Sequence, residues 1–161
     1  MPCLSCTMAV LDRFYSAFQD RDWATMGACY HPDAHFSDPV FPDLDAAGVR
    51  AMWKMLLTNG TDLRIGFSVL EESGTNGKAE WEAHYTFSRT GRSVHNEVVS
   101  SFEMKNGLIL RQLDEFDFWK WSRQALGTPG LLLGWSPLIK NKVRATAAKG
   151  LARITKTEVV E

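Results

Sequence analysis

The sequence predicts an α+β fold: a cone-shaped α+β barrel in which N-terminal helices pack on a strongly bent antiparallel sheet, followed by a C-terminal helical extension. Two observations carry this prediction. Apolar residues recur every three or four positions up to about residue 58, whereas from residue 62 onward they alternate with polar residues. With 161 residues, of which 45% are hydrophobic, the chain is long enough to bury one continuous core. We therefore expect a single domain over 1–161, with its core at about 8–119 and the extension at about 120–161.

Three helices are expected before the sheet. The first covers residues 8–20, the second follows Asp22 as N-cap, and the third runs from Asp45 as N-cap to about Thr58, where Asn59-Gly60 stops it. A brief strand is expected at 34–37, after the helix-breaking His31-Pro32-Asp33. The inward-facing residues expected on the three helices are Val10, Leu11, Phe14 and Phe18 with Tyr15 and Ala17 nearby; Trp23, Met26 and Tyr30; and Val49, Met52, Trp53, Leu56 and Leu57.

Four antiparallel strands are expected because three turn signals interrupt the alternating region. Strands this long must twist and bend strongly, and a bent sheet with helices across its concave side encloses a cavity. The inward faces carry the odd positions from Trp81 to Phe87 and the even positions from Val94 to Met104. The approximate strand limits are 62–72, 78–88, 92–104 and 108–119.

The last of these strands carries polar groups where a core is expected. Gln112 and Asp114 share the parity of Leu110 and Phe116, so all four point to one face. Burying a carboxylate is costly unless it is hydrogen-bonded, paired or neutralised, which makes Asp114 a candidate site residue. The structural alternative is a carboxylate bonded to Asn96, Trp81 or Tyr85. Glu115 and Asp117 have the other parity and are expected in solvent.

The C-terminal extension is basic, and the body of the chain is acidic. Residues 120–161 hold eight Lys/Arg and two Asp/Glu, a balance of +6, whereas residues 1–119 hold ten and seventeen, a balance of -7. The overall charge of -1 argues against general nucleic-acid binding. After the breaker at 127–130 an apolar run is expected to need cover, and Ser136-Pro137 begins a helix to about Thr155. The solvated basic face of this helix is favoured over binding to an anionic membrane or a partner. The members of the apolar run are Leu131, Leu132, Leu133, Trp135 and Leu138.

Localisation and metal content are predicted from what the sequence lacks. No run of about 18 apolar residues indicates a membrane span, and the first residues do not resemble a signal peptide, so a cytoplasmic protein without stable membrane insertion is expected. Cys3 and Cys6 are interpreted as two reduced thiols. His35, His84 and His95 lack metal-ligand spacing, so no metal and no cofactor are expected.

The order of these motifs resembles the NTF2-like superfamily, and within it the SnoaL-like and ketosteroid-isomerase-like branch. The resemblance covers roughly residues 8–119. It rests on Arg13-Phe14-Tyr15-Ser16-Ala17-Phe18 followed by Asp22, on His35-Phe36-Ser37-Asp38-Pro39-Val40, and on the closing strand from Asn106-Gly107 to Asp117. Function varies widely among proteins of this fold, so the resemblance predicts the architecture more firmly than the activity.

The resemblance implies acid/base chemistry at Asp38, which matches the general base of ketosteroid isomerases. The donors that hold the substrate oxygen in those enzymes fall on Phe14 and Ser100, and Tyr15 is turned away by about 100°. This departure argues against steroid isomerisation. SnoaL-like cyclases and limonene-epoxide-hydrolase-like members also use pocket acids, so Asp38 and Asp114 are predicted to form a pair with one proton between them. Arg111 has the wrong parity to complete a hydrolase set.

Two functions remain open at this point. One is a cofactor-independent isomerase, cyclase, lyase or hydrolase acting on a small hydrophobic carbonyl or hydroxyl compound, with Asp38 and Asp114 as catalytic residues. The other is a non-catalytic protein that binds a small hydrophobic ligand. Family habit also implies a homodimer through the outer sheet face, around His95, Val99 and Ser101. The predicted ligand-binding residues are Phe14, Phe18, Trp53, Trp81, Tyr85, Asn96, Ser100 and Phe116.

Overall fold

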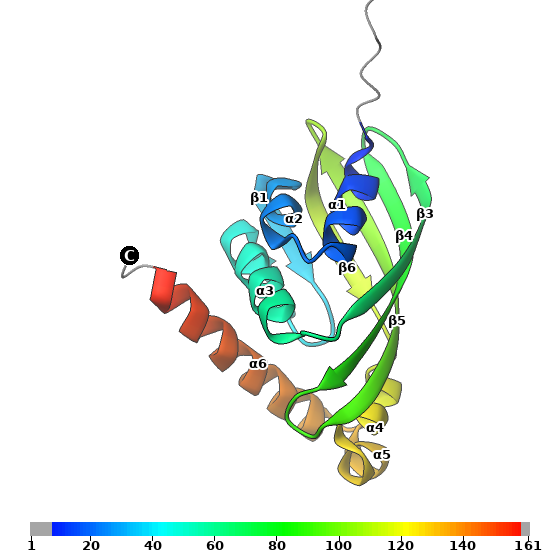
Figure 1. The fold of residues 1–161 in the computed structure, drawn as a ribbon, viewed down its shortest axis with the longest axis vertical. Coiled ribbons are helices and arrows are strands. Elements are labelled where there is room, and N and C mark those ends of the chain that lie inside the picture. The colour runs from blue at the N-terminus through cyan, green and yellow to red at the C-terminus, as the bar shows by residue number, and fades with distance from the viewer. Residues whose placement is uncertain (1–7, 159–161) are drawn as a thin grey trace, which may run out of the picture.

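The computed structural model describes residues 8–158, so the predicted thiols Cys3 and Cys6 lie outside the described residues. Helices and strands follow one another in the expected order, with three helices before the strand meander and further helices after it (Figure 1). The elements are α1 (Val10–Gln19), α2 (Trp23–Ala28), β1 (Tyr30–Ser37), β2 (Leu44–Asp45), α3 (Ala46–Asn59), β3 (Arg64–Glu72), β4 (Asn76–Phe87), β5 (Arg92–Lys105), β6 (Leu108–Glu115), α4 (Phe118–Leu126), α5 (Thr128–Leu133) and α6 (Pro137–Glu158).

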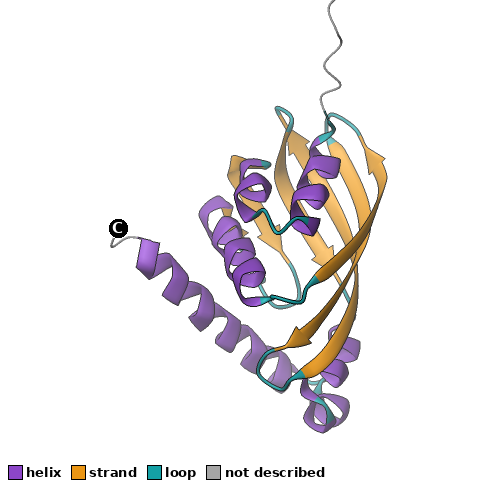
Figure 2. Ribbon diagram, viewed as in Figure 1, coloured by secondary structure: helices purple, strands orange, loops and turns teal. Residues whose placement is uncertain are grey.

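The strands form a six-stranded sheet in the order β2-β1-β6-β5-β4-β3. The meander from β3 to β6 is antiparallel, as predicted, but β1 pairs in parallel with β6. Figure 2 shows the long strands curving around α1, α2 and α3, which lie on the concave side. The α+β cone predicted from the change of period is therefore confirmed.

Both predicted aspartate caps are present. The Asp22 carboxylate accepts a hydrogen bond from Thr25 N, and Asp45 accepts one from Gly48 N, each satisfying an amide that the first helical turn leaves unpaired. The apolar stripe of α1 is buried, with Leu11 and Phe14 at 0% exposure. Trp23 was expected to face inward but is 39% exposed, and Lys54 Nζ lies 4.8 Å from the centre of its ring.

Two element boundaries differ from the prediction, and both changes bear on the site. Strand β1 begins at Tyr30, not at 34, so Tyr30 is the first residue of a strand instead of the end of a helix. Strand β6 ends at Glu115, because Asp117 accepts a hydrogen bond from Lys120 N and caps α4. Parity within β6 is as predicted from Gln112 onward: Gln112 and Asp114 are buried, while Leu113 and Glu115 are exposed. It was wrong for Leu110, because the register of β5 and β6 shifts before Arg111 and Ile109 is the fully buried residue.

The C-terminal extension packs on the body through the predicted apolar side of α6. Ala147 and Ile154 contact the main core cluster, whereas Ile139 and Val143 contact a second cluster around Trp121. The helix break predicted over residues 127–130 is confined to Gly127. The chain turns there, with φ of 70°, and α5 begins at the next residue. No helix within residues 8–158 has the length and apolar character needed to cross a membrane.

Candidate functional site

Asp114 lies at the centre of a buried polar network inside the cone. Its side chain is 3% exposed. The Ser100 hydroxyl donates to Asp114 Oδ1 at 2.5 Å, and the Gln112 amide donates to the same oxygen at 3.0 Å. Ser100 in turn accepts a hydrogen bond from Trp81 Nε1 at 2.9 Å. No described residue donates to Oδ2, so this oxygen is the one that a substrate group can use.

The network continues from Gln112 to the helix side of the cone. The Tyr30 hydroxyl donates to Gln112 Oε1 at 2.5 Å and accepts from Trp53 Nε1 at 2.9 Å. Gln112 is thereby held at both ends, because its amide oxygen binds Tyr30 and its amide nitrogen binds Asp114. Groups held this way keep Asp114 in one orientation, which is the preorganisation that acid/base chemistry requires.

Burial sets the protonation of Asp114. Desolvation raises the pKa of Asp114 to about 7; the hydrogen bonds from Ser100 and Gln112 oppose this shift, and the negative charge of Asp38 adds to it. A carboxyl group with a pKa near the pH of its surroundings can both remove and return a proton.

Asp38 acts electrostatically on Asp114. The parallel pair β1–β6 ends with Ser37 opposite Leu113, one residue before Asp38 and Asp114, and the negative charge of Asp38 raises the pKa of Asp114. Desolvation raises the pKa of Asp38 to about 6, while hydrogen bonds from the backbone of Phe41 and Val40 and the charge of Arg144 oppose the shift. Two neighbouring carboxyls with raised pKa values fit the predicted pair that resists double ionisation.

Asp38 also has a structural role in its own loop. Its Oδ1 accepts hydrogen bonds from Val40 N at 2.7 Å and Phe41 N at 2.6 Å, which closes the loop between β1 and β2. Arg144 of α6 donates from Nε to the Pro39 carbonyl at 2.8 Å and so fastens the extension to this loop. Loop closure occupies one oxygen of Asp38 and leaves Oδ2 without a hydrogen bond from the described residues.

Tyr15 belongs to the apolar stripe expected on the first helix, but its hydroxyl was expected to be out of reach of the site. The side chain is 0% exposed, and its ring stacks on Phe67 at 5.2 Å. Burial raises the pKa of Tyr15 well above its usual value, the charge of Asp114 raises it further, and Ser100 opposes both. Its hydroxyl is buried and has no hydrogen-bond partner among the described residues. The hydroxyl therefore lies near Asp114 and Ser100 without a hydrogen bond of normal geometry.

The predicted ligand-binding residues fall into two groups. Phe14, Phe18, Trp53 and Trp81 surround the network, with Phe18 4.9 Å from Trp53 and 5.2 Å from Trp81 between ring centres. Ser100 is part of the network itself. Tyr85 and Phe116 instead join the second cluster, where the Tyr85 hydroxyl accepts from Trp121 Nε1 at 2.7 Å. Asn96 lies opposite Ala83 in the sheet, two residues along β5 from the pair formed by Val98 and Trp81.

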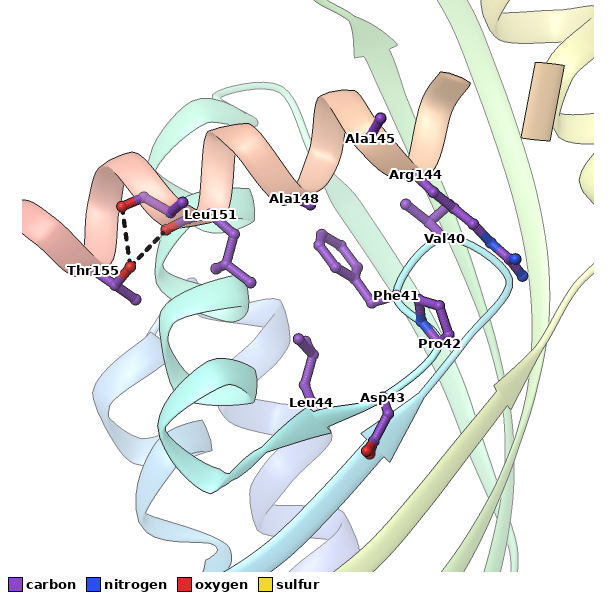
Figure 3. Close-up of a pocket in the computed structure, with 11 residues that line it drawn as sticks. Val40, Phe41, Pro42, Asp43, Leu44, Arg144, Ala145, Ala148, Leu151 and Thr155 are labelled. Carbon is purple, nitrogen blue, oxygen red and sulfur yellow. Dashed lines mark hydrogen bonds between the residues drawn. The ribbon is translucent and has the colours of Figure 1, made fainter. Parts of the chain in front are cut away.

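Two hollows stand out on the surface of residues 8–158, and Asp114 lines neither. The larger, of about 500 Å³, lies between α6 and the loop after β1 (Figure 3). Phe41 and Val40 point from the loop toward α6 in this view, and Arg144 reaches over the loop. The second, of about 320 Å³, is lined by Arg92, Lys120, Arg123 and Gln124. Aromatic rings pack beside the network, and the cavity expected at Asp114 stays a prediction.

The outer sheet face brings together three possible metal ligands that the sequence keeps apart. His84 and His95 are opposite each other in β4 and β5, and their rings stack at 4.0 Å. His95 Nε2 lies 2.8 Å from Glu82 Oε2, and the ligand atoms of all three residues lie within 4.8 Å of one another. Spacing along the chain did not reveal this cluster, because strand pairing creates it. The expectation that the chain needs no metal remains a prediction.

Chelation tests that prediction. We expect EDTA to leave Tm unchanged, because Glu82 already contacts His95 and their side chains are 49% and 40% exposed to water. An ion that stabilised the fold would be lost on chelation and would lower Tm. Differential scanning fluorimetry with and without EDTA makes the measurement, and His95→Ala serves as the variant without the cluster. A fall in Tm in the wild type that is missing in His95→Ala would show a structural metal at this cluster.

Comparisons with known proteins give the family and the fold. The model of the SnoaL-like domain matches residues 11–112. No curated protein matches the sequence. Solved structures with the same fold include an NTF2-like protein of unknown function from Burkholderia pseudomallei, with 22% identity and a TM-score of 0.63 over 73% of this chain and 95% of that one.

Two further structures have named activities. A proposed polyketide cyclase from Xanthomonas campestris is 20% identical, with a TM-score of 0.61 over 71% of this chain and 93% of the other. An epoxide hydrolase of the LEH-like type from Mycobacterium tuberculosis is 17% identical, with a TM-score of 0.58 over 76% and 90%. At these identities the likeness shows a shared fold and no shared substrate. The family match covers more than half of the chain, and the chain therefore belongs to the SnoaL-like domain family.

Proposed function

We propose that this protein is a cofactor-independent acid/base catalyst that acts on a small hydrophobic compound bearing a carbonyl or hydroxyl group. One observation carries the proposal: Asp114 is buried, fixed by Ser100 and Gln112 through one oxygen, and has a pKa of about 7, raised chiefly by desolvation. A carboxylate with only a structural role would be stabilised by hydrogen bonds to both of its oxygens. Asp114 has instead an open oxygen and a proton that it can exchange near neutral pH.

The arrangement suits proton removal from a carbon next to a carbonyl. Asp114 Oδ2 accepts the proton, and the electron pair of the broken C–H bond moves toward the carbonyl oxygen, which becomes negative. The unpaired Tyr15 hydroxyl supplies a hydrogen bond to that oxygen. Asp38 is the second proton carrier, because its charge raises the pKa of Asp114 and its own pKa is raised by burial to about 6. The enolate formed this way is the common intermediate of isomerisation, aldol cyclisation and elimination.

Deuterium exchange tests the proposal without knowledge of the natural substrate. Small cyclic enones and aromatic ketones are incubated with the protein in D₂O, and NMR follows uptake at the carbon next to the carbonyl. We expect Asp114→Asn to slow enzyme-dependent exchange by about a hundredfold or more. Asp38→Asn should abolish turnover of a compound that still binds, and Tyr15→Phe should slow it less. Binding is measured by quenching of tryptophan fluorescence, because Trp53 and Trp81 lie beside the network.

Glu115→Gln is the matched control. It removes a carboxylate from the next position of the same strand, but Glu115 is exposed and points to the outer face. Its exchange rate should equal that of the wild type. Wild-type exchange rates in both Asp114→Asn and Asp38→Asn would defeat the catalytic assignment.

The alternative function is binding of a small hydrophobic ligand without turnover. It is favoured by the aromatic rings of Phe14, Phe18, Trp53 and Trp81 around the network, and by the use of one Asp38 oxygen in closing its own loop. The same experiment separates the two. A compound that quenches fluorescence, and whose exchange is no faster with wild-type protein than with Asp114→Asn, is a ligand and not a substrate.

A further inference from the structure

The C-terminal extension combines an uncovered apolar surface with an unbalanced positive charge. The family match ends at residue 112, so the extension is an addition to the family core. Between Phe118 and Thr157 the chain has eight Lys/Arg and no Asp/Glu. A stretch of forty residues with this composition has no partner for most of its charge within itself. We therefore expect the partner of this extension to be negatively charged.

Five large apolar side chains stand in solvent at the corner formed by α5 and the start of α6. We call these residues the apolar tip. The α4–α5–α6 corner lies at one end of the molecule, away from α1 and α2 (Figure 1). Exposed apolar groups scattered singly are ordinary, but a cluster this dense marks an interaction surface. The members are Leu131, Leu132, Leu133, Trp135 and Leu138, with exposures of 50%, 62%, 43%, 70% and 69%.

The apolar tip is exposed because α5 uses its glycines to contact the body. Gly130 lies against the backbone of Ser122, and Gly134 lies against the Ser122 hydroxyl. Trp119 Nε1 donates to the Leu131 carbonyl at 3.2 Å, which holds the start of the tip on α4. The leucines therefore project away from α4, and the fold itself presents them outward.

Cations adjoin the apolar tip on both sides. Lys140 and Lys142 follow it at the start of α6, and Arg123 lies over the ring of Trp119, 4.4 Å from its centre. Arg123 also lines the hollow of about 320 Å³ together with Arg92, Lys120 and Gln124. The Nε of Arg123 is buried and has no hydrogen-bond partner among the described residues. Lys120 is paired with Glu97 at 3.1 Å, and Arg92 Nε donates to the Gln124 carbonyl at 2.8 Å, so Arg123 is the cation in the hollow that is best placed to take an anion.

We propose that the apolar tip and its flanking cations bind the surface of an anionic lipid bilayer. Leucine and tryptophan side chains enter the boundary between headgroups and acyl chains, while Lys140, Lys142 and Arg123 contact lipid phosphates. A second copy of the chain fits this surface less well. An isologous contact would place each cluster of cations against itself with no acidic residue of the extension to balance it.

Vesicle binding tests the proposal on the full chain. Flotation is measured with vesicles of phosphatidylcholine alone and with vesicles that also contain phosphatidylglycerol. We expect binding to the mixed vesicles, weakening as salt rises, and no binding to phosphatidylcholine. The double variant Leu132→Ser/Trp135→Ser should bind at least about tenfold more weakly, because it removes the most apolar contacts. Lys140→Glu and Lys142→Glu should each weaken binding by about fivefold or more.

Matched controls come from exposed residues elsewhere on the fold. Leu70→Ser changes a leucine of β3 that is 49% exposed, and Lys105→Glu reverses a charge at the end of β5. Both should bind like the wild type, and all variants should keep the wild-type circular dichroism spectrum. No binding to mixed vesicles at low salt would overturn the proposal, as would binding that the tip variants leave intact. A concentration-dependent dimer in light scattering that Leu132→Ser/Trp135→Ser dissolves would assign the tip to a second copy instead.

Discussion

Asp114→Asn should unfold at a higher denaturant concentration than the wild type at pH 8, and at nearly the same concentration at pH 4. Desolvation raises the pKa of Asp114 from 3.8 to about 7. A carboxyl group whose folded pKa is raised contributes stability below pH 3.8, and that contribution is lost as pH rises through about 7. At 1.36 kcal/mol for each pKa unit, the free energy of unfolding falls by an amount on the order of 4 kcal/mol. Asparagine keeps the acceptor for Ser100 and Gln112 but carries no charge, so the variant does not suffer this loss.

Chemical denaturation across this pH range makes the measurement. Both proteins share the other titrating groups, including Asp38, whose pKa burial raises to about 6, so the difference between the two curves isolates Asp114 to a first approximation. Glu115→Gln, exposed at the next position, should give a difference that stays flat with pH. An Asp114→Asn variant that is less stable than the wild type at pH 8 would mean that the ionised carboxylate is well stabilised in the fold. The proposed proton carrier would then lose its basis.

Local chemistry made most of the fold predictable from sequence. The change of period from 3.6 to 2 separates the helices from the meander, and the caps at Asp22 and Asp45 place the helix starts because short carboxylates bind free amides. Parity along β6 correctly buried Asp114 and exposed Glu115. These features depend on residues close together in the chain, where spacing determines geometry.

Most of the groups around Asp114 were not predictable, because they come from other elements. Ser100 meets Asp114 through the register of β5 and β6, and Asp38 follows a strand whose parallel pairing with β6 no turn signal indicates. Tyr30 was assigned to a helix end, since Pro32 marks a break without showing that a strand begins before it. The Tyr15 hydroxyl was expected out of reach because Tyr15 is one residue from Phe14 on the helix. Both side chains are nevertheless 0% exposed. Gln112 had the strongest signal, the same parity as Asp114.

Gly130→Ala should be strongly destabilising for the α4–α5 corner although it exchanges the poorest ordinary helix former for the best. A methyl group at Gly130 would lie 1.9 Å from the Ser122 carbonyl oxygen and 2.4 Å from its carbon. Both are backbone atoms that a rotamer change cannot move. Ser122 is 0% exposed, and its hydroxyl donates to the Trp119 carbonyl at 2.9 Å, so it has little room to shift. Overpacking of this kind costs about 1–3 kcal/mol and can exceed that.

The sign of the effect decides whether α5 is docked. If α5 lay free of α4, alanine would stabilise it by about 1 kcal/mol, because glycine has the higher conformational entropy when unfolded. If α5 is docked against Ser122, Gly130→Ala lowers stability instead. The variant should then show faster hydrogen exchange and proteolysis across residues 128–136, while β3 to β6 stay protected. Gly74→Ala is the control, since a methyl group there would meet nothing within 4 Å. A Gly130→Ala variant at least as stable as the wild type would detach α5 from α4, and with it the rigid presentation of Leu131 and Leu132 on which bilayer binding depends.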